Sequence, residues 1–77
     1  MTGARRRVLE AVRNGAQHAA DIFDLAGLDQ LVGEMAVRRL LADGLIREYG
    51  RLDWPTYELT RAGWTELARQ PEVPGGR

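Results

Sequence analysis

Apolar residues recur at helical spacing near the start of the chain, which predicts two short helices there. The first is expected from about Ala4 to Arg13, and Gly15 is expected to end it because glycine tolerates the left-handed conformation common at a helix C-terminus. Its inner face is formed by Val8, Leu9, Val12 and Ala16. The second helix is predicted from about Ala19 to Leu25, and its inward-facing residues are Ile22 and either Leu25 or Ala26.

A third, longer helix is predicted from about Gln30 to Asp43. Asp29 suits its N-terminus, because a carboxylate accepts hydrogen bonds from free backbone amides, and Gly44 is expected to end it. Its inner stripe is expected to be Gly33, Val37, Leu40 and Gly44. The outer face then carries Leu31, Met35, Arg38, Arg39 and Ala42, flanked by Gln30 and Glu34. Gly33 either lets this helix approach the second one closely or weakens it by up to about 1 kcal/mol.

After Gly44 the pattern changes from helical spacing to short strands. Residues 45–49 and 56–59 are predicted strands, joined by a loop at 50–55 that starts with glycine and ends with proline. Thr60 is expected to cap a fourth helix at 61–69, with its inner face formed by Trp64, Leu67 and Ala68. The order predicts a mostly α-helical domain with a small β-hairpin, α-α-α-β-β-α, over residues 1–70, and a flexible tail at 71–77.

Composition narrows the class of protein. A chain of 77 residues fits one domain, and the absence of cysteine excludes disulfides and thiolate metal sites. No apolar run suits a signal peptide or a membrane span, so we expect a cytoplasmic protein. All eleven basic residues are arginines and equal the eleven acidic ones, and the zero net charge is unfavourable for a nucleic-acid binder. The preference for arginine, alanine and glycine indicates a GC-rich genome, such as that of an actinobacterium or its phage.

Two segments resemble a known family. The segment from Gly27 to Ile46, GLDQLVGEMAVRRLLADGLI, resembles the helix-turn-helix core of winged-helix regulators, whose recognition helix ends in a leucine followed by Gly-Leu-Ile or Gly-Leu-Val. The segment from Tyr57 to Leu67, YELTRAGWTEL, is similar to the pattern that closes the wing in those proteins. The resemblance is to the broad MarR, PadR and phage-repressor-like group, and it extends over about residues 4–69.

This resemblance implies a winged helix-turn-helix protein that binds double-stranded DNA sequence-specifically, as a small transcriptional regulator of bacterial or phage origin. The third helix would enter the major groove and the wing would reach a neighbouring backbone or minor groove. The implied DNA-contacting residues are Gln30, Leu31, Met35, Arg38, Arg39 and Arg51, with Arg5, Arg6 and Arg7 on phosphates. Arginine suits phosphates and guanine edges, but these side chains could instead be solvated and paired with acids, as Arg51 with Asp53.

Other features favour a protein partner or a second copy of the chain. Residues 18–34 contain no arginine and four carboxylates, Asp21, Asp24, Asp29 and Glu34. Leu31 and Met35 either touch thymine methyl groups or form, with Glu34, a protein interface. A continuous positive strip across the third helix and the wing would favour DNA, and a negative face with an apolar centre would favour protein.

No pattern indicates catalysis, a cofactor, a metal site or a small-molecule ligand, so we expect a protein that is not an enzyme. His18, the one histidine, is expected to cap the second helix or lie on the surface. Asp21 and Asp24 are expected to be solvated rather than to form a catalytic carboxylate pair. Trp54 is expected to pack on the hairpin rather than stack on a base or partner, and Trp64 is expected in the core.

Overall fold

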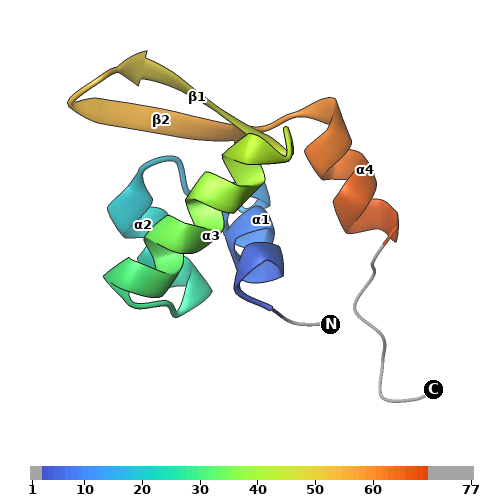
Figure 1. Ribbon diagram of the computed structural model, residues 1–77, viewed down its shortest axis with the longest axis horizontal. Coiled ribbons are helices and arrows are strands. Elements are labelled where there is room, and N and C mark those ends of the chain that lie inside the picture. The colour runs from blue at the N-terminus through green and yellow to red at the C-terminus, as the bar shows by residue number, and fades with distance from the viewer. Residues whose placement is uncertain (1–2, 70–77) are drawn as a thin grey trace.

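Three helices form the base of the fold, close to the predicted positions. In the computed structural model, which describes residues 3–69, α1 spans Ala4–Arg13, α2 spans Ala19–Ala26 and α3 spans Gln30–Ala42 (Figure 1). The Asp29 carboxylate accepts a hydrogen bond from the backbone N–H of Val32 at 2.8 Å, which confirms the predicted cap. Gly44, beyond the C-cap Asp43, has φ of +74°, so the predicted end of α3 is also correct. The tail predicted at 71–77 lies outside the described residues.

The wing is a two-stranded antiparallel sheet of β1, Ile46–Arg51, and β2, Trp54–Leu59. Both strands extend into the predicted loop, where Gly50 pairs with Pro55, and residues 52–53 form the turn. Proline is tolerated here because both strands of a two-stranded sheet are edge strands. The backbone N–H of Tyr57 also donates to the carbonyl of Gln17 at 2.8 Å, which attaches the wing to the loop between α1 and α2.

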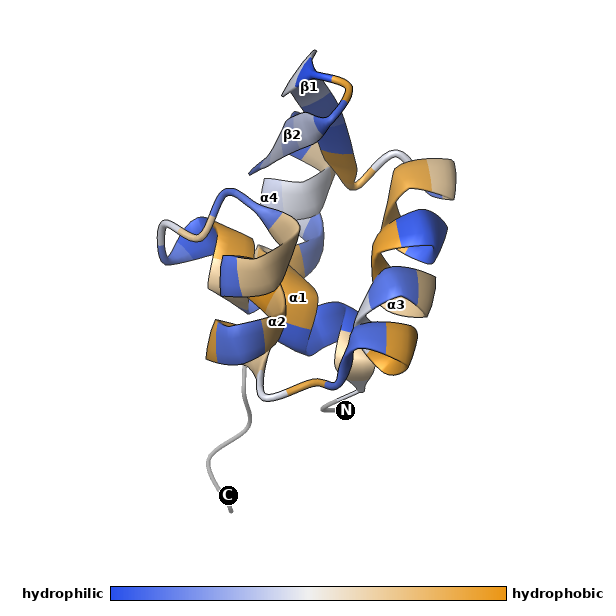
Figure 2. Cartoon of the chain, turned by 90° about the vertical axis from the view of Figure 1, so that its left-hand side faces the viewer, coloured by the Kyte–Doolittle hydropathy of each residue, from blue (hydrophilic) through white to orange (hydrophobic). Residues whose placement is uncertain are grey.

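The core lies between α1, α2 and α3 and continues under the wing. Its largest fully buried side chains are Val8, Ile22 and Leu40, and Ile46 and Tyr57 extend it into the hairpin. Hydrophobic and hydrophilic residues alternate along α3, as its one buried face requires (Figure 2). A Cβ at Gly33 would lie 2.5 Å from the Phe23 ring. Gly33 therefore allows the close approach of α2 and α3, which was one of its two predicted roles.

The last helix, α4, spans Arg61–Arg69 as predicted, but its predicted inner face is correct only for Leu67. Trp64 is 53% exposed and Ala68 is exposed, whereas Gly63 and Leu67 are buried. A Cβ at Gly63 would lie 2.1 Å from the carbonyl oxygen of Leu45, so α4 packs directly on backbone at this point. This contact turns Gly63 and Leu67 inward and leaves Trp64 facing outward. The Thr60 hydroxyl caps the helix, accepting from the N–H of Gly63 at 3.1 Å.

Candidate nucleic-acid interface

The outer face of α3 is open to solvent along its length. Leu31 is 69% exposed and Met35 is 63% exposed, and the other predicted contact residues of this helix are also exposed: Gln30, Arg38 and Arg39. The Gln30 amide donates to the Glu34 carboxylate at 3.1 Å, so these two flanking residues hold each other in place. The structure therefore brings the predicted residues of α3 together on one accessible face.

The two arginines of this helix differ in their partners. Arg39 Nε lies 3.5 Å from Asp43 Oδ2, and Arg5 Nη1 donates to the same oxygen at 2.9 Å. Arg38 has no ion-pair partner among residues 3–69. Arg38 is thus available to an external anion without losing an internal contact. Arg39 would have to share or leave Asp43, at small cost because exposed ion pairs are weak.

Arg51, near the tip of the wing, forms a bidentate pair with Asp53. Its Nε and Nη2 donate to the two carboxylate oxygens at 3.1 and 3.0 Å. The two side chains are 79% and 71% exposed. Arg51 is therefore paired with Asp53, as the alternative to a DNA contact predicted. Because exposed ion pairs are weak, Arg51 can still leave Asp53 for another anion.

Trp54 lies at the start of β2, beside the turn at the tip of the wing, and its ring packs on a residue outside the hairpin, not on the hairpin as predicted. Its ring lies 4.7 Å from the His18 ring, and it remains 58% exposed. His18 Nδ1 is 3.0 Å from the carbonyl oxygen of Pro55. His18 occupies the N-cap position of α2, but its side chain makes no cap hydrogen bond and turns toward the wing, so it does not cap the helix as predicted. No local pattern could reveal this contact, since its partners are far apart in the sequence.

The arginines at the start of α1 are not equivalent phosphate ligands. Arg5 is joined to α3 through Asp43. The Arg6 side chain is only 10% exposed, and it donates to Glu10 at 3.0 Å within the same helix. Arg7 is exposed and has no ion-pair partner within residues 3–69. The geometry therefore connects Arg5 to the α3 face but leaves Arg6 occupied on α1.

Charge is divided unevenly between two parts of the molecule. Residues 18–60, which contain α2, α3 and the wing, carry four arginines and eight carboxylates, a formal net charge of −4. The remaining helices, α1 and α4, carry six arginines and two glutamates, a net charge of +4. The positive strip that would favour DNA is therefore interrupted across α3 and the wing. The nonspecific electrostatic attraction of this face to DNA phosphates should therefore be weak.

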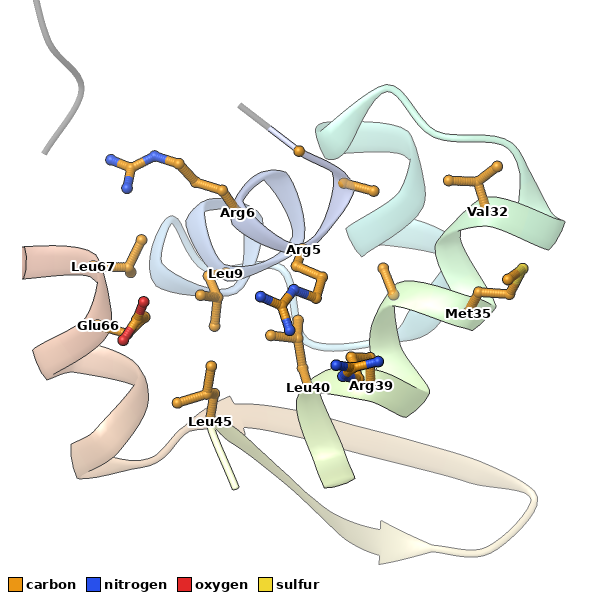
Figure 3. A pocket seen from close by; sticks show the side chains of 13 residues that line it. Arg5, Arg6, Leu9, Val32, Met35, Arg39, Leu40, Leu45, Glu66 and Leu67 are labelled. Carbon is orange, nitrogen blue, oxygen red and sulfur yellow. The ribbon is translucent and has the colours of Figure 1, made fainter. Parts of the chain in front are cut away.

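A groove of about 480 Å³ lies beside the outer face of α3, between α1, α3 and α4. Figure 3 shows Leu9, Leu45 and Leu67 pointing toward one another at one end, and Arg5 and Arg39 side by side on the α3 side. Within residues 3–69 no cluster of three or more histidines or carboxylates could hold a metal ion. No helix of this region has the length and apolar character needed to cross a membrane.

Comparison with known proteins gives structural likeness alone. No family model matches the sequence, and the search of curated proteins gives no match. BpsR of Bordetella bronchiseptica, a protein whose DNA binding is regulated by 6-hydroxynicotinic acid, superposes with a TM-score of 0.80 at 21% identity, over 87% of this chain and 54% of that one. A MarR-family transcriptional regulator from Silicibacter pomeroyi gives a TM-score of 0.78 at 25% identity, over 90% of this chain and 48% of that one.

A smaller DNA-binding protein, Sso10a-2 from Sulfolobus solfataricus, gives a TM-score of 0.70 at 19% identity, over 87% of this chain and 73% of that one. The chain spans about half the length of BpsR and of the Silicibacter pomeroyi protein, covering 54% and 48% of their chains. The chain therefore has the predicted winged helix-turn-helix fold, α-α-α-β-β-α, in the form found in MarR-family transcriptional regulators.

Proposed function

We propose that this chain binds duplex DNA sequence-specifically and acts as a transcriptional regulator of bacterial or phage origin. The observation that carries the proposal is the open outer face of α3, with the unpaired Arg38 at its centre, in a fold shared with DNA-binding regulators. The proteins with this likeness are described as regulators or DNA-binding proteins rather than as enzymes. A regulator of this kind would act in the cytoplasm, where bacterial DNA is found.

In the proposed complex α3 lies in the major groove. The Arg38 guanidinium is suited to donate two hydrogen bonds to a guanine edge, and Leu31 and Met35 to contact thymine methyl groups. Arg39 and Arg5, which already converge on one carboxylate, would bind a phosphate. Arg51 would leave Asp53 for the backbone or minor groove at the flank.

Selection from a random duplex library at low salt tests this proposal. Replacing Arg38, Arg39 and Arg51 together by alanine should weaken binding to the selected site by at least about 100-fold, because a base contact and two phosphate contacts are lost. The matched control replaces the same number of arginines outside the interface, Arg13, Arg61 and Arg69. It should weaken binding only a few-fold, through net charge. Absence of binding to any duplex, or equal effects of the two triple variants, would overturn the proposal.

A second candidate function is binding of a protein partner through the same face. The observation that favours it is the net charge of −4 over residues 18–60 around the exposed pair Leu31 and Met35. Such a surface suits a basic partner with an apolar centre, or a second copy of the chain if Leu31 and Met35 meet their own counterparts. Substitution of both by serine should then abolish binding to that partner, while Arg38→Ala leaves it unchanged. The opposite pattern, loss with Arg38→Ala, would favour DNA.

A further inference from the structure

The charge division leaves two complementary surfaces on one chain. We propose that copies of this chain associate head to tail, with the outer face of α2 in one copy docking into the groove between α1, α3 and α4 of the next. In Figure 1 α2 and α4 lie on opposite sides of the molecule, so one copy can use both surfaces at once. The proposal does not require α3 to bind DNA, but it uses Arg5 and Arg39, so this contact and the proposed phosphate contact of the same arginines exclude each other.

The groove has the character of a receptor for an acidic, apolar segment. Its interior is formed by aliphatic side chains, Leu9, Val32, Ala36, Leu40, Leu45 and Leu67. At its edge Arg5 and Arg39 share the single carboxylate of Asp43, which leaves that cluster with a net charge of +1. Glu66 lies on the α4 side, away from this cluster, and Arg6 points out of the groove (Figure 3).

The outer face of α2 supplies the complementary shape and charge. Asp21, Asp24 and Leu25 are three and four residues apart, which puts them on one side of the helix. Leu25 is 57% exposed, and neither aspartate has an ion-pair partner in the described part of the chain. Figure 2, seen from this side, shows hydrophilic and hydrophobic residues next to one another on α2. Leu25 can therefore enter the apolar groove while the two carboxylates face Arg5 and Arg39.

This arrangement differs from a symmetric dimer in a testable way. In each contact one copy contributes its α2 face and the other contributes its groove. The association is therefore not closed at two copies and can grow by adding one copy at a time. The contact is centred on a short helix, so the association is weak and depends on concentration. It also depends on salt, because the charged groups are exposed.

Sedimentation equilibrium of the full chain, and of variants altered on one surface only, tests the proposal. The parent mass should rise with concentration above twice the 8.6 kDa of the chain at low salt, and should fall back toward one copy in about 0.5 M NaCl. Asp21→Arg/Asp24→Arg disables the α2 face, and Val32→Glu disables the groove without touching Arg38, Arg39 or Arg51. Each variant alone should remain monomeric, with the circular dichroism of the parent.

Mixing the two variants is the decisive measurement. The intact α2 of the Val32→Glu chain should dock into the intact groove of the aspartate variant, and the mixture should form a one-to-one dimer that grows no further. Adding Leu25→Ser to the Val32→Glu chain, which supplies α2, should abolish this dimer. The proposal is overturned by a monomeric parent at millimolar concentration, by a failure of the variants to complement, or by a parent mass that stops at two copies. If the groove instead binds a small acidic peptide or a foreign protein, the parent should remain monomeric at millimolar concentration.

Discussion

Gly44 and Gly63 are both required, for different physical reasons. At Gly44 the backbone is left-handed, with φ of +74°, and no atom lies within 4 Å of the place where a Cβ would be. At Gly63 a Cβ would lie 2.1 Å from the carbonyl oxygen of Leu45. The first requirement could be predicted, because a glycine after an apolar helical stripe commonly ends a helix. The second could not, because it depends on a residue in another element.

Gly44→Val should destabilise the domain by at least about 1 kcal/mol, because a β-branched side chain is strained at positive φ. Gly44→Asn should cost less, since asparagine tolerates this conformation. Thermal denaturation of the three proteins measures both effects. Coincident melting curves for parent and valine variant would show that the left-handed end of α3 is not needed.

Gly63→Ala should destabilise the domain by roughly 1–3 kcal/mol, because α4 must move away from the Leu45 carbonyl. Gly33→Ala provides the comparison. Its added methyl group meets the Phe23 side chain rather than backbone, and alanine also improves helix propensity. Urea titrations should therefore give a larger loss at Gly63. The reverse order would contradict the backbone contact as the reason for this glycine.

Tyr57 makes the stability of the domain sensitive to alkaline pH. Its hydroxyl donates to Glu48 at 2.9 Å, and burial, reinforced by Glu48, raises the pKa of Tyr57 from 10.0 to about 12. The unfolded state therefore loses this proton first, so stability is complete below pH 10 and falls as the pH rises toward the folded pKa. Urea titration at pH 8 and at about pH 11.5 should differ by about 2 kcal/mol. Tyr57→Phe should remove most of this difference, whereas Tyr49→Phe should retain it.

The elements themselves were predictable because their signals are local. Helical spacing and capping residues located all four helices to within one residue, and Asp29 and Thr60 cap α3 and α4 as expected. The rotation of α4 was not predictable, because tryptophan normally favours burial and only the contact of Gly63 with Leu45 turns Trp64 outward. The exposed face of α3 followed from periodicity. The partners of its arginines did not, because Asp43 and Arg5 meet only in the folded chain.

The wing has a counter-charge that should limit its binding. The two carboxylate oxygens of Asp53 accept hydrogen bonds from Nε and Nη2 of Arg51, along one edge of the guanidinium. If Arg51 contacts DNA, Asp53→Asn should strengthen binding a few-fold by releasing it and by removing a negative charge near the phosphates. Arg51→Ala should weaken binding, with the larger effect on A/T-rich flanks if the side chain enters the minor groove. Fluorescence anisotropy with matched flanking sequences separates these cases, and weaker binding by Asp53→Asn would exclude a wing contact through Arg51.

Negative and positive side chains are concentrated in different halves of the molecule. The half that carries α3 and the wing has a net charge of −4, and the half formed by α1 and α4 has +4. A duplex approaching α3 is therefore repelled at long range and attracted only at the few exposed arginines. Affinity for DNA of arbitrary sequence must be low, so recognition would rest on a small number of direct contacts.

This charge division predicts a shallow salt dependence of DNA binding. Three to five phosphate contacts, the number that the arginines near α3 and the wing can supply, correspond to a slope of about −3 to −4.5 in log K against log salt. Arg39→Ala should reduce the magnitude of this slope by about 0.9, the share of one phosphate contact. Arg38→Ala should leave the slope unchanged and relax preference at one base pair, because its proposed contact is a guanine edge. Glu34→Gln should raise affinity at every salt concentration without adding a contact. A slope much steeper than −5, or a loss of affinity with Glu34→Gln, would mean that the duplex binds the positive α1 and α4 half instead.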